Sequence, residues 1–267
     1  MQKFIIFTDL DGTLLHPRTY SFNEASPALE LIRKRDIPLI FCSSKTRAEI
    51  EVYRSRLSNR YPFISENGGG IFIPEGYFPF PVVGETQAGY RLVSFGRPYQ
   101  ELRTVLADLR VRLSIKVKGF GDMSVHEVAA LSGLSTPEAA LAKMRDFDEP
   151  FIFEEDGAKR DVFLQAIEVR GYRWTRGKFY HIMGENDKGS AVTVLKGLYE
   201  KQYGPLRAIG IGDNLNDLPL LRAVDCPVLV QNENGTYVEE ISLPNIIKAD
   251  GIGPQGWNRA ILRLLAE

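Results

Sequence analysis

The first sixty residues alternate between short apolar runs and helical patterns. Strand-like runs start at Phe4 and at Leu39, and the apolar positions between Asn23 and Asp36 follow the spacing of a helix. A second helix is expected after Thr46, whose side chain can cap the first turn. Strand, helix, strand and helix in succession indicate a parallel sheet and the α/β fold class.

The pattern changes after residue 62. Residues 63–73 are expected to form a strand, a tight glycine turn and a strand, and the proline-rich stretch 74–81 marks a boundary because proline breaks regular elements. Strands and helices then mix without a repeat, with strands expected at 91–95, 114–117, 151–153, 172–174 and 178–181 and helices near residues 99, 125, 137 and 162. A further apolar run at 208–212 resumes the first pattern.

Composition limits the classes of partner. The chain has 267 residues with 33 basic and 34 acidic side chains, so it carries no excess of charge that would attract nucleic acid or a membrane surface. No stretch approaches the roughly 20 apolar residues of a membrane span, and the amino-terminal run is too short for a signal peptide. The two cysteines, Cys42 and Cys226, lie in apolar stretches as buried thiols of a reducing compartment do. We therefore expect a cytoplasmic protein.

Two carboxylates follow the first apolar run. Asp9 and Asp11 are two residues apart in the string Asp9-Leu10-Asp11-Gly12-Thr13, so an extended backbone points both side chains the same way, at the sheet edge where α/β proteins bind ligands. Adjacent carboxylates repel unless a cation neutralises them, and their oxygens suit Mg²⁺ with a phosphate as a further ligand. One carboxylate can attack phosphorus while the other transfers the proton. As a bare pattern the string also fits turn chemistry alone.

The string from Asp9 to Thr13 is similar to the first motif of the haloacid dehalogenase superfamily of phosphohydrolases. Three later segments resemble that family in the same order: Leu39-Ile40-Phe41-Cys42-Ser43-Ser44, Asn186-Asp187-Lys188-Gly189 and Ala208-Ile209-Gly210-Ile211-Gly212-Asp213-Asn214-Leu215-Asn216-Asp217. The resemblance implies Asp9 as the nucleophile, Asp11 as general acid and base, and Lys188 as the cation that balances the nucleophile and the phosphoryl group. It implies a Mg²⁺ ion held by Asp9, Asp213 and the backbone carbonyl of Asp11, with Asn214 and Asp217 orienting these groups.

The insertion between the second strand pair and the lysine motif resembles the large α/β cap of the sugar-phosphatase branch of the superfamily. Because the last motifs lie after the insertion, the two outer segments must close into one core. We therefore predict an α/β protein with a Rossmann-like parallel-sheet core at 1–82 and 185–267. An inserted α+β cap domain at 83–184 is expected to close the site and select the leaving group.

Several strings narrow the resemblance to the mannosyl-3-phosphoglycerate phosphatase family: Ser43-Ser44-Lys45-Thr46-Arg47, Glu66-Asn67-Gly68-Gly69-Gly70, Gly119-Phe120-Gly121-Asp122-Met123, Arg145-Asp146-Phe147-Asp148-Glu149 and Lys178-Phe179-Tyr180-His181. The family implies Mg²⁺-dependent hydrolysis of mannosyl- or glucosyl-3-phosphoglycerate through an aspartyl-phosphate. The product, a glycosyl-glycerate, is a compatible solute. The residues expected to contact substrate are Ser43, Ser44, Lys45, Arg47, Asn67, Arg145, Asp148 and Asn214.

Individual contacts within this set carry different expectations. Ser43 takes the place of the hydroxyl that holds the phosphate, and Asp148 can accept hydrogen bonds from sugar hydroxyls. A guanidinium binds a carboxylate with two hydrogen bonds, so Arg47, Arg145 or Arg176 is expected to bind the glycerate carboxylate. His181 is left outside the chemistry, as a hydrogen-bonded structural histidine.

Three alternatives remain open from the sequence. A broad-specificity sugar phosphatase would keep the same core and hydrolyse sugar phosphates that lack the glycerate. A phosphosugar mutase would pass the phosphoryl group from the aspartate to a second hydroxyl, and a noncatalytic binding module would not need the acids. The expected partner is a small phosphorylated glycoside, mannosyl or glucosyl, with no nucleic acid and no membrane. The sequence does not fix the oligomeric state.

Overall fold

A five-stranded parallel sheet organises the outer segments of the chain. The structure is a computed structural model that describes residues 2–155 and 159–266. The strands follow the order β13-β12-β11-β1-β2, and every pair is parallel. Their bounds are β1 (Phe4–Thr8), β2 (Leu39–Phe41), β11 (Arg207–Gly212), β12 (Cys226–Gln231) and β13 (Ile247–Ile252). Strand β1 is thus paired on both edges.

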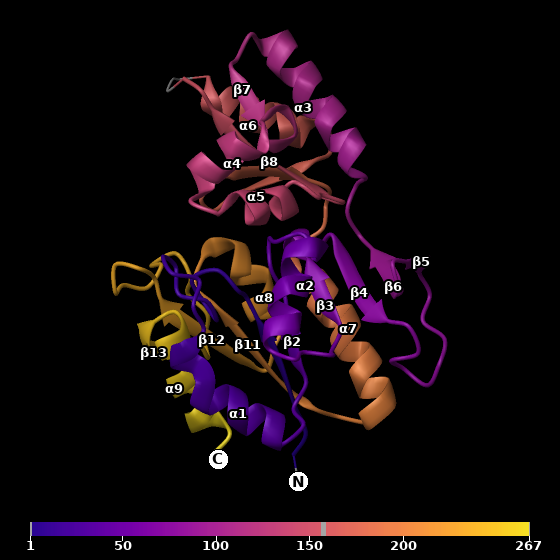
Figure 1. Cartoon of the computed structure of the whole chain (residues 1–267), viewed down its shortest axis with the longest axis vertical. Helices are drawn as coiled ribbons and strands as arrows, with labels where there is room; N and C mark the ends of the chain where they lie inside the picture. The colour runs from indigo at the N-terminus through magenta and orange to yellow at the C-terminus, as the bar shows by residue number, and fades with distance from the viewer. Residues whose placement is uncertain (1, 156–158, 267) are drawn as a thin grey trace.

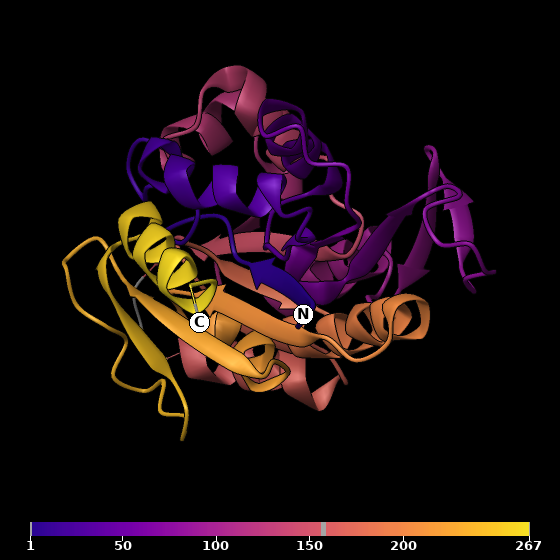
Figure 2. The same ribbon diagram turned by 90° about the horizontal axis from the view of Figure 1, so that it is seen from below.

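Helices cover both faces of this sheet. Ile6 points into one apolar cluster with α1 (Ser26–Lys34), α2 (Arg47–Arg56) and α9 (Pro254–Leu264), while Ile5 and Phe7 point into another with α7 (Lys188–Tyr203) and α8 (Leu218–Arg222). Figure 2 shows α1 and α9 side by side on one face. Because both faces of β1 are buried, the strand is apolar throughout rather than alternating. The predicted α/β class and Rossmann-like core are confirmed.

A second, antiparallel sheet extends the core. It has the order β3-β4-β6-β5, from β3 (Phe63–Ser65), β4 (Gly70–Pro74), β6 (Tyr90–Ser94) and β5 (Glu85–Gln87). A bridge between Cys42 and Ile64 ties it to the end of β2. The predicted strand–turn–strand at 63–73 is confirmed, and its turn is the single 3-10 turn η2 (Glu66–Gly68). The hairpin β5–β6 pairs with β4, although it falls within the segment predicted as cap.

A third sheet forms a separate lobe that lies beyond the carboxyl ends of the parallel strands (Figure 1). Its antiparallel order is β7-β8-β10-β9, from β7 (Val117–Gly119), β8 (Asp148–Phe153), β10 (Tyr180–Met183) and β9 (Arg173–Arg176). The lobe also holds α3 (Tyr99–Leu113), α4 (Val125–Ser132), α5 (Thr136–Ala142) and α6 (Arg160–Val169). We call it the cap lobe. The exact boundaries predicted at 83 and 184 stay a prediction.

One expected strand begins later in the chain than predicted. The strand predicted at 114–117 begins only at Val117. Ser114 adopts a left-handed conformation with φ 50° and ends α3, so the residues that follow it turn before the strand starts. Among the residues that the structure describes, no helix is long and apolar enough to cross a membrane.

The start of α2 links the two lobes. The Thr46 hydroxyl accepts a hydrogen bond from the Glu49 amide at 3.1 Å, and the Glu49 carboxylate accepts one from the Thr46 amide at 2.9 Å, which confirms the predicted N-cap. The Thr46 hydroxyl also donates to the backbone carbonyl of Leu141 in the cap lobe at 3.0 Å. One side chain therefore stabilises a helix and a contact between the lobes.

We expect Thr46→Ala to lower the free energy of unfolding by about 2 kcal/mol. Loss of an N-cap costs about 1 kcal/mol, and the lost contact with Leu141 adds about another. Urea titration measures the loss, with Ser124→Ala as the matched control. Ser124 forms the same capping box at the start of α4, so its removal is expected to cost about 1 kcal/mol. Equal losses in the two variants would contradict a stabilising role for the Leu141 contact.

Candidate active site

Two neighbouring parallel strands bring acids to one edge of the sheet. Asp9 follows β1 directly, and its amide donates to the carbonyl of Ile211 in β11 at 2.9 Å, so Asp213 at the end of β11 lies beside it. Gly12 follows in the same loop with φ +80°, and a Cβ there would lie 2.7 Å from the Asp213 carboxylate. Only glycine therefore lets this loop approach Asp213.

Lys188 joins the acids from the first turn of α7. Its ammonium donates to Asp9 Oδ1 and to Asp217 Oδ1, both at 2.6 Å, and the side chain is 1% exposed. The second oxygen of Asp217 accepts from the backbone amides of Asp213 at 3.0 Å and of Asn214 at 3.2 Å. A buried cation thus lies between two buried carboxylates, an arrangement in which each charge depends on the others.

The acids are arranged to hold a cation. One carboxylate oxygen from each of Asp9, Asp213 and Asp217 lies within 4.8 Å of the others. Thr13 donates to Asp213 Oδ1 at 2.8 Å, which leaves Asp213 Oδ2 without a hydrogen bond in the described part of the chain. Hard carboxylate oxygens are the ligands that Mg²⁺ prefers. The donor set therefore fits a hard divalent cation.

Burial makes this cluster unfavourable without such a cation. It raises the pKa of Asp9 to about 7, although the charge of Lys188 opposes the shift. Burial, together with the charges of Asp217 and Asp9, also raises the pKa of Asp213 well above its usual value. Three carboxylates against one ammonium leave an excess of negative charge that a divalent ion would offset.

Asp11 is held by a second buried lysine. Its side chain is 40% exposed, and Asp11 Oδ2 lies 2.9 Å from the ammonium of Lys45. Lys45 is itself 6% exposed and lies 3.5 Å from Glu49, with its ammonium 5.3 Å from the ring of Tyr20 and 5.7 Å from that of Tyr53. Lys45 was predicted to contact substrate, and the structure places its charge against Asp11.

The segment after β2 holds several of the predicted substrate contacts. Ser43 is fully buried, its Oγ accepts from the Lys45 amide at 3.2 Å, and its carbonyl accepts from the Asn67 amide at 3.0 Å. The carbonyl of Ser44 accepts from Arg145 Nη1 at 2.8 Å. Arg47 pairs instead with Glu51 at 2.9 Å along α2. The four predicted substrate contacts in this segment, Ser43, Ser44, Lys45 and Arg47, therefore have separate surroundings.

The glycine turn between β3 and β4 joins the core to the cap lobe. Glu66 is fully buried and accepts backbone hydrogen bonds from Asp146 at 2.9 Å and Phe147 at 2.8 Å, while burial raises its pKa to about 8. Gly68 has φ +87°, and a Cβ there would lie 2.1 Å from the carbonyl of Asp187, next to Lys188. The turn thus touches both the cap lobe and the start of α7.

Asn67 extends this junction into the cap lobe. The side-chain amide of Asn67 donates to Asp148 Oδ2 at 3.2 Å, and His181 Nδ1 lies 2.8 Å from Asp148 Oδ1. Although burial opposes it, the charge of His181 and its hydrogen bond keep the pKa of Asp148 below its usual value. Because Nδ1 faces Asp148, the other ring nitrogen of His181 is the one available to the cavity, which His181 lines.

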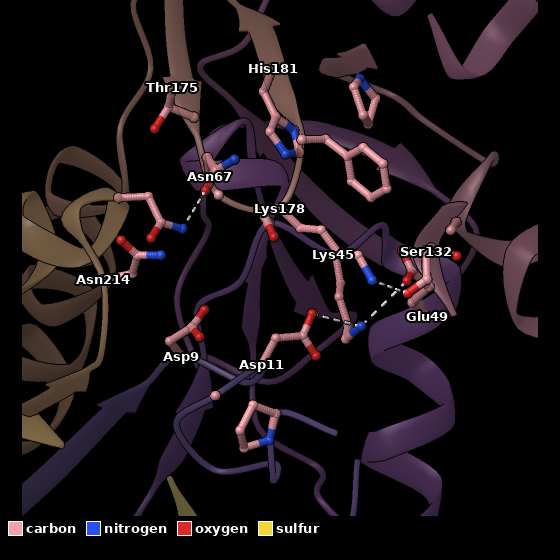
Figure 3. A pocket seen from close by; sticks show the side chains of 18 of the residues that line it. Asp9, Asp11, Lys45, Glu49, Asn67, Ser132, Thr175, Lys178, His181 and Asn214 are labelled. Atoms are coloured by element: carbon pink, nitrogen blue, oxygen red, sulfur yellow. Dashed lines mark hydrogen bonds and ion pairs between the residues drawn. The ribbon is translucent and has the colours of Figure 1, made fainter. Parts of the chain in front are cut away.

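A cavity of about 550 Å³ lies between the two lobes. This volume falls in the range of small-molecule sites. Asp9, Asp11 and Asp213 line it from the core, and the β9–β10 hairpin lines it from the cap lobe (Figure 3). The other polar lining residues include Tyr20, Ser44, Lys45, Glu49, Asn67, Ser132, Arg145, Thr175, Lys178, His181, Asn214 and Asn216. The acids thus face a space large enough for a substrate.

Some expected site residues lie behind the lining rather than in it, namely Ser43, Arg47, Asp148, Lys188 and Asp217. Other polar residues of the site were not singled out from the sequence: Tyr20, Asn216, Lys178 and Thr13. Thr13, Lys178 and Asn216 fall inside the quoted strings, so the strings themselves were a signal. Asn216 donates to Asn67 Oδ1 at 3.4 Å. Tyr20 reaches the site through tertiary folding alone.

Comparisons with known proteins agree on one family. A family model described as haloacid dehalogenase-like hydrolase matches residues 6–77. The chain is 47% identical to a protein of Methanococcoides burtonii named glucosyl-3-phosphoglycerate/mannosyl-3-phosphoglycerate phosphatase, over 99% of this chain and 98% of that protein. It is 44% identical to a protein of the same name from Persephonella marina, over 98% and 97% of the two chains.

Solved structures show the same fold at low identity. One described as a sugar phosphatase of haloacid dehalogenase subclass IIB superposes with a TM-score of 0.64. The two are 14% identical, with 99% of this chain and 98% of that chain covered. The likeness extends over both lobes, so the arrangement of a parallel-sheet core with an inserted cap is shared.

Proposed function

The chain belongs to the haloacid dehalogenase-like hydrolases and, within them, to the glucosyl-3-phosphoglycerate/mannosyl-3-phosphoglycerate phosphatases, and from this membership we propose that it hydrolyses glycosyl-3-phosphoglycerates. The products are the glycosyl-glycerate and phosphate. The family predicted from the motifs is confirmed. The observation that carries the proposal is the bridge of Lys188 between Asp9 and Asp217 at the edge of a cavity that Asp9 and Asp213 line.

We assign the nucleophile to Asp9. A carboxylate oxygen of Asp9 attacks phosphorus, and the bond from phosphorus to the glycerate oxygen breaks. Asp11, two residues on and open to the cavity, donates a proton to that departing oxygen. Lys188 offsets the negative charge that gathers around Asp9 as the phosphoryl group arrives.

Hydrolysis of the aspartyl-phosphate uses the same two acids in reverse. Asp11, now ionised, takes a proton from a water molecule whose oxygen attacks phosphorus. The bond from phosphorus to the Asp9 oxygen breaks, phosphate leaves, and Asp9 is again a carboxylate. Lys45 lies 2.9 Å from the carboxylate of Asp11 and so fixes the position from which Asp11 donates the first proton and accepts the second.

Mg²⁺ is the cation that we propose for the acidic cluster. Asp9, Asp213 and the backbone carbonyl of Asp11 would hold it, and Asp217, whose two oxygens have protein partners, would orient Asp213 and Asn214. When bound, the ion supplies positive charge to the phosphate oxygens and neutralises the nucleophile for approach of an anion.

The remaining predicted residues divide between phosphate and glycoside. We assign Ser43 to the phosphate, and Ser44, Asn67, Arg145 and Asn214 to the cavity wall against the glycoside. Asp148 is fully buried and holds His181, so we assign it a positioning role, with His181 rather than Asp148 meeting the sugar hydroxyls. Arg47 pairs with Glu51 and supports the start of α2.

We place the enzyme in the cytoplasm, with a small phosphorylated glycoside as its ligand. Two observations support this: both cysteines are free and buried, as is usual in a reducing compartment, and no described helix could span a membrane.

Phosphate release tests the proposed function. With Mg²⁺ we expect turnover of mannosyl-3-phosphoglycerate and glucosyl-3-phosphoglycerate and little release from 3-phosphoglycerate or mannose 6-phosphate. EDTA is expected to lower the rate at least about 100-fold, since the metal contributes several kcal/mol to charge stabilisation. Restoring the rate with Mg²⁺ after EDTA treatment controls for damage to the protein.

Two outcomes would contradict the proposal. Equal or faster release from mannose 6-phosphate would make the enzyme a broad-specificity sugar phosphatase. Transfer of the phosphoryl group to a second sugar hydroxyl, without free phosphate over many turnovers, would make it a mutase.

A further inference from the structure

The proposed substrate has two separate anionic groups. Its phosphate is met by the acidic cluster with its cation and by Lys188, and its glycerate carboxylate lies two carbons further along. A carboxylate is bound best by a charge-assisted hydrogen bond from a side-chain cation. The cavity should therefore offer a cation away from the phosphate end whose charge is not already balanced.

Lys45 and Arg145 line the cavity, but acids already balance their charge. Lys45 lies 2.9 Å from Asp11 and 3.5 Å from Glu49. Arg145 is almost completely buried, donates to the carbonyls of Ser44 and Ala142 at 2.8 Å each, and lies 3.7 Å from Asp148. Breaking either set of contacts to bind a ligand would leave buried charges without partners.

The other two arginines predicted for the carboxylate do not reach the cavity. Arg47 pairs with Glu51, and Arg176 lies over the ring of Tyr180 at 5.0 Å. Neither lines the cavity between the lobes.

Lys178 differs from all of these. It lines the cavity from the turn between β9 and β10, and within residues 2–155 and 159–266 its ammonium has no carboxylate within ion-pair distance. One N–H donates to the carbonyl of Ser132 at 2.5 Å, which leaves two N–H groups for a ligand. The cavity thus has a positive charge on its cap side that the protein itself does not neutralise.

The surroundings hold this lysine in place. Its neighbour Phe179 stacks edge-on against Phe120 at 4.9 Å, and the Gly177 amide donates to the Phe179 carbonyl at 3.0 Å to close the turn. Figure 3 shows Lys178 reaching toward Ser132 on the side of the cavity where His181 lies, across from Asp9. The hairpin therefore presents the ammonium from a fixed backbone.

We propose that Lys178 binds the carboxylate of the leaving group and so selects phosphoglycerate esters over other sugar phosphates. This assignment rests on the proposed function. The ammonium takes the carboxylate with its two remaining N–H groups while the Ser132 carbonyl keeps the third, so binding needs no rearrangement of the hairpin.

Lys178 also has a structural contact that the test must separate from binding. Ser132 is the last residue of α4, and a lysine that donates to a terminal carbonyl stabilises a helix end. Loss of that contact alone would lower stability and affect all substrates equally. Loss of a carboxylate ligand would affect only substrates that carry the carboxylate.

The experiment compares two esters that differ in one group: glucosyl-3-phosphoglycerate and the matching glucosylglycerol phosphate, in which a hydroxymethyl group replaces the carboxylate. For Lys178→Met we expect kcat/KM on glucosyl-3-phosphoglycerate to fall about 10- to 100-fold, mainly through KM, which is the scale of a hydrogen bond to a charged group. On glucosylglycerol phosphate we expect kcat/KM to fall less than about 3-fold, because that ester has no carboxylate to lose. Lys178→Arg should keep most of the preference. Arg176→Met removes a cation from the same hairpin outside the cavity and should leave the ratio unchanged.

Product binding separates the failure of this proposal from failure of the proposed function. Calorimetry measures the affinity of glucosylglycerate and of glucosylglycerol without turnover. The proposal expects the wild-type protein to prefer glucosylglycerate and Lys178→Met to lose that preference, even if another phosphate ester proves to be the substrate. Equal losses on both esters, or an unchanged preference in Lys178→Met, would overturn it.

Discussion

Replacing Asp9 with asparagine is expected to abolish phosphate release, with a fall in kcat of at least about 10⁴-fold, as found when a covalent nucleophile is removed from an enzyme. An amide cannot attack phosphorus, and the described residues place no other carboxylate against Lys188 except Asp217, whose second oxygen accepts two backbone hydrogen bonds. The measurement is steady-state phosphate release from glucosyl-3-phosphoglycerate at saturating Mg²⁺.

The fold should survive this change. The carbonyl oxygen of an asparagine can still accept from Lys188, as Asp9 Oδ1 does at 2.6 Å. Asp161→Asn on the exposed first turn of α6 is the matched control and should keep full activity. A variant at position 9 that retained more than about a tenth of the rate would exclude Asp9 as the nucleophile and point to direct attack by water.

The parts of the site that depend on chain order could be predicted from the sequence. An apolar strand followed by Asp9, Asp11 and a glycine specifies a sheet edge locally, because side-chain direction alternates along a strand and glycine permits the tight loop. The same holds for the N-cap at Thr46, which needs only Glu49 three residues later. Such features require no knowledge of the rest of the fold.

The parts of the site that depend on contacts between the two lobes could not be predicted from the sequence. Arginine is the usual ligand of a carboxylate, so the sequence favoured Arg47, Arg145 and Arg176, yet acids, backbone carbonyls or an aromatic ring occupy all three. Lys178 begins one of the strings that resemble the family, but nothing in that string marked it as a ligand of the carboxylate. Whether a cation is free depends on which acids the fold places beside it, and sequence spacing carries no information on that.

The burial of Asp148 shows the same limit. From the sequence it was a polar residue in a cap, suited to sugar hydroxyls. In the structure Asn67 of the core and His181 of the cap lobe both bind it, and it has no exposed surface. The pairing of β8 with β10 brings Asp148 opposite Met183, two residues from His181, across a separation of more than thirty residues.

The second large effect is expected for Lys188→Met, on stability as well as rate. Removing the buried ammonium leaves Asp9 and Asp217 facing each other without compensation, and breaking a buried ion pair in this way costs about 3–5 kcal/mol. Loss of charge stabilisation at the phosphoryl group should lower kcat by at least about 10²-fold. The measurements are urea titration without Mg²⁺ and phosphate release with it.

Lys196→Met is the matched control. Lys196 lies on the same helix and pairs with Asp225 at 3.0 Å, but that pair is partly exposed, so its loss should cost less than about 1 kcal/mol. A loss for Lys188→Met as small as that of the control would mean that Asp9 and Asp217 are not both charged in the folded protein.

The pH dependence of the Lys188→Met effect has a definite sign. Burial raises the pKa of Asp9 to about 7 in the folded protein from about 4 in the unfolded chain. Protonation of Asp9 therefore stabilises the folded state at low pH, and this contribution to the free energy of unfolding is lost as pH rises through 7. At pH 5 Asp9 is neutral and needs Lys188 less; at pH 8 it is ionised and depends on it. We therefore expect the destabilisation by Lys188→Met to be larger at pH 8 than at pH 5.

Mg²⁺ at pH 8 should restore part of the lost stability, because a divalent ion among Asp9, Asp213 and Asp217 replaces the missing positive charge. A variant that lost equal stability at both pH values, and recovered none with Mg²⁺, would show that Lys188 stabilises the fold by packing rather than by balancing these carboxylates.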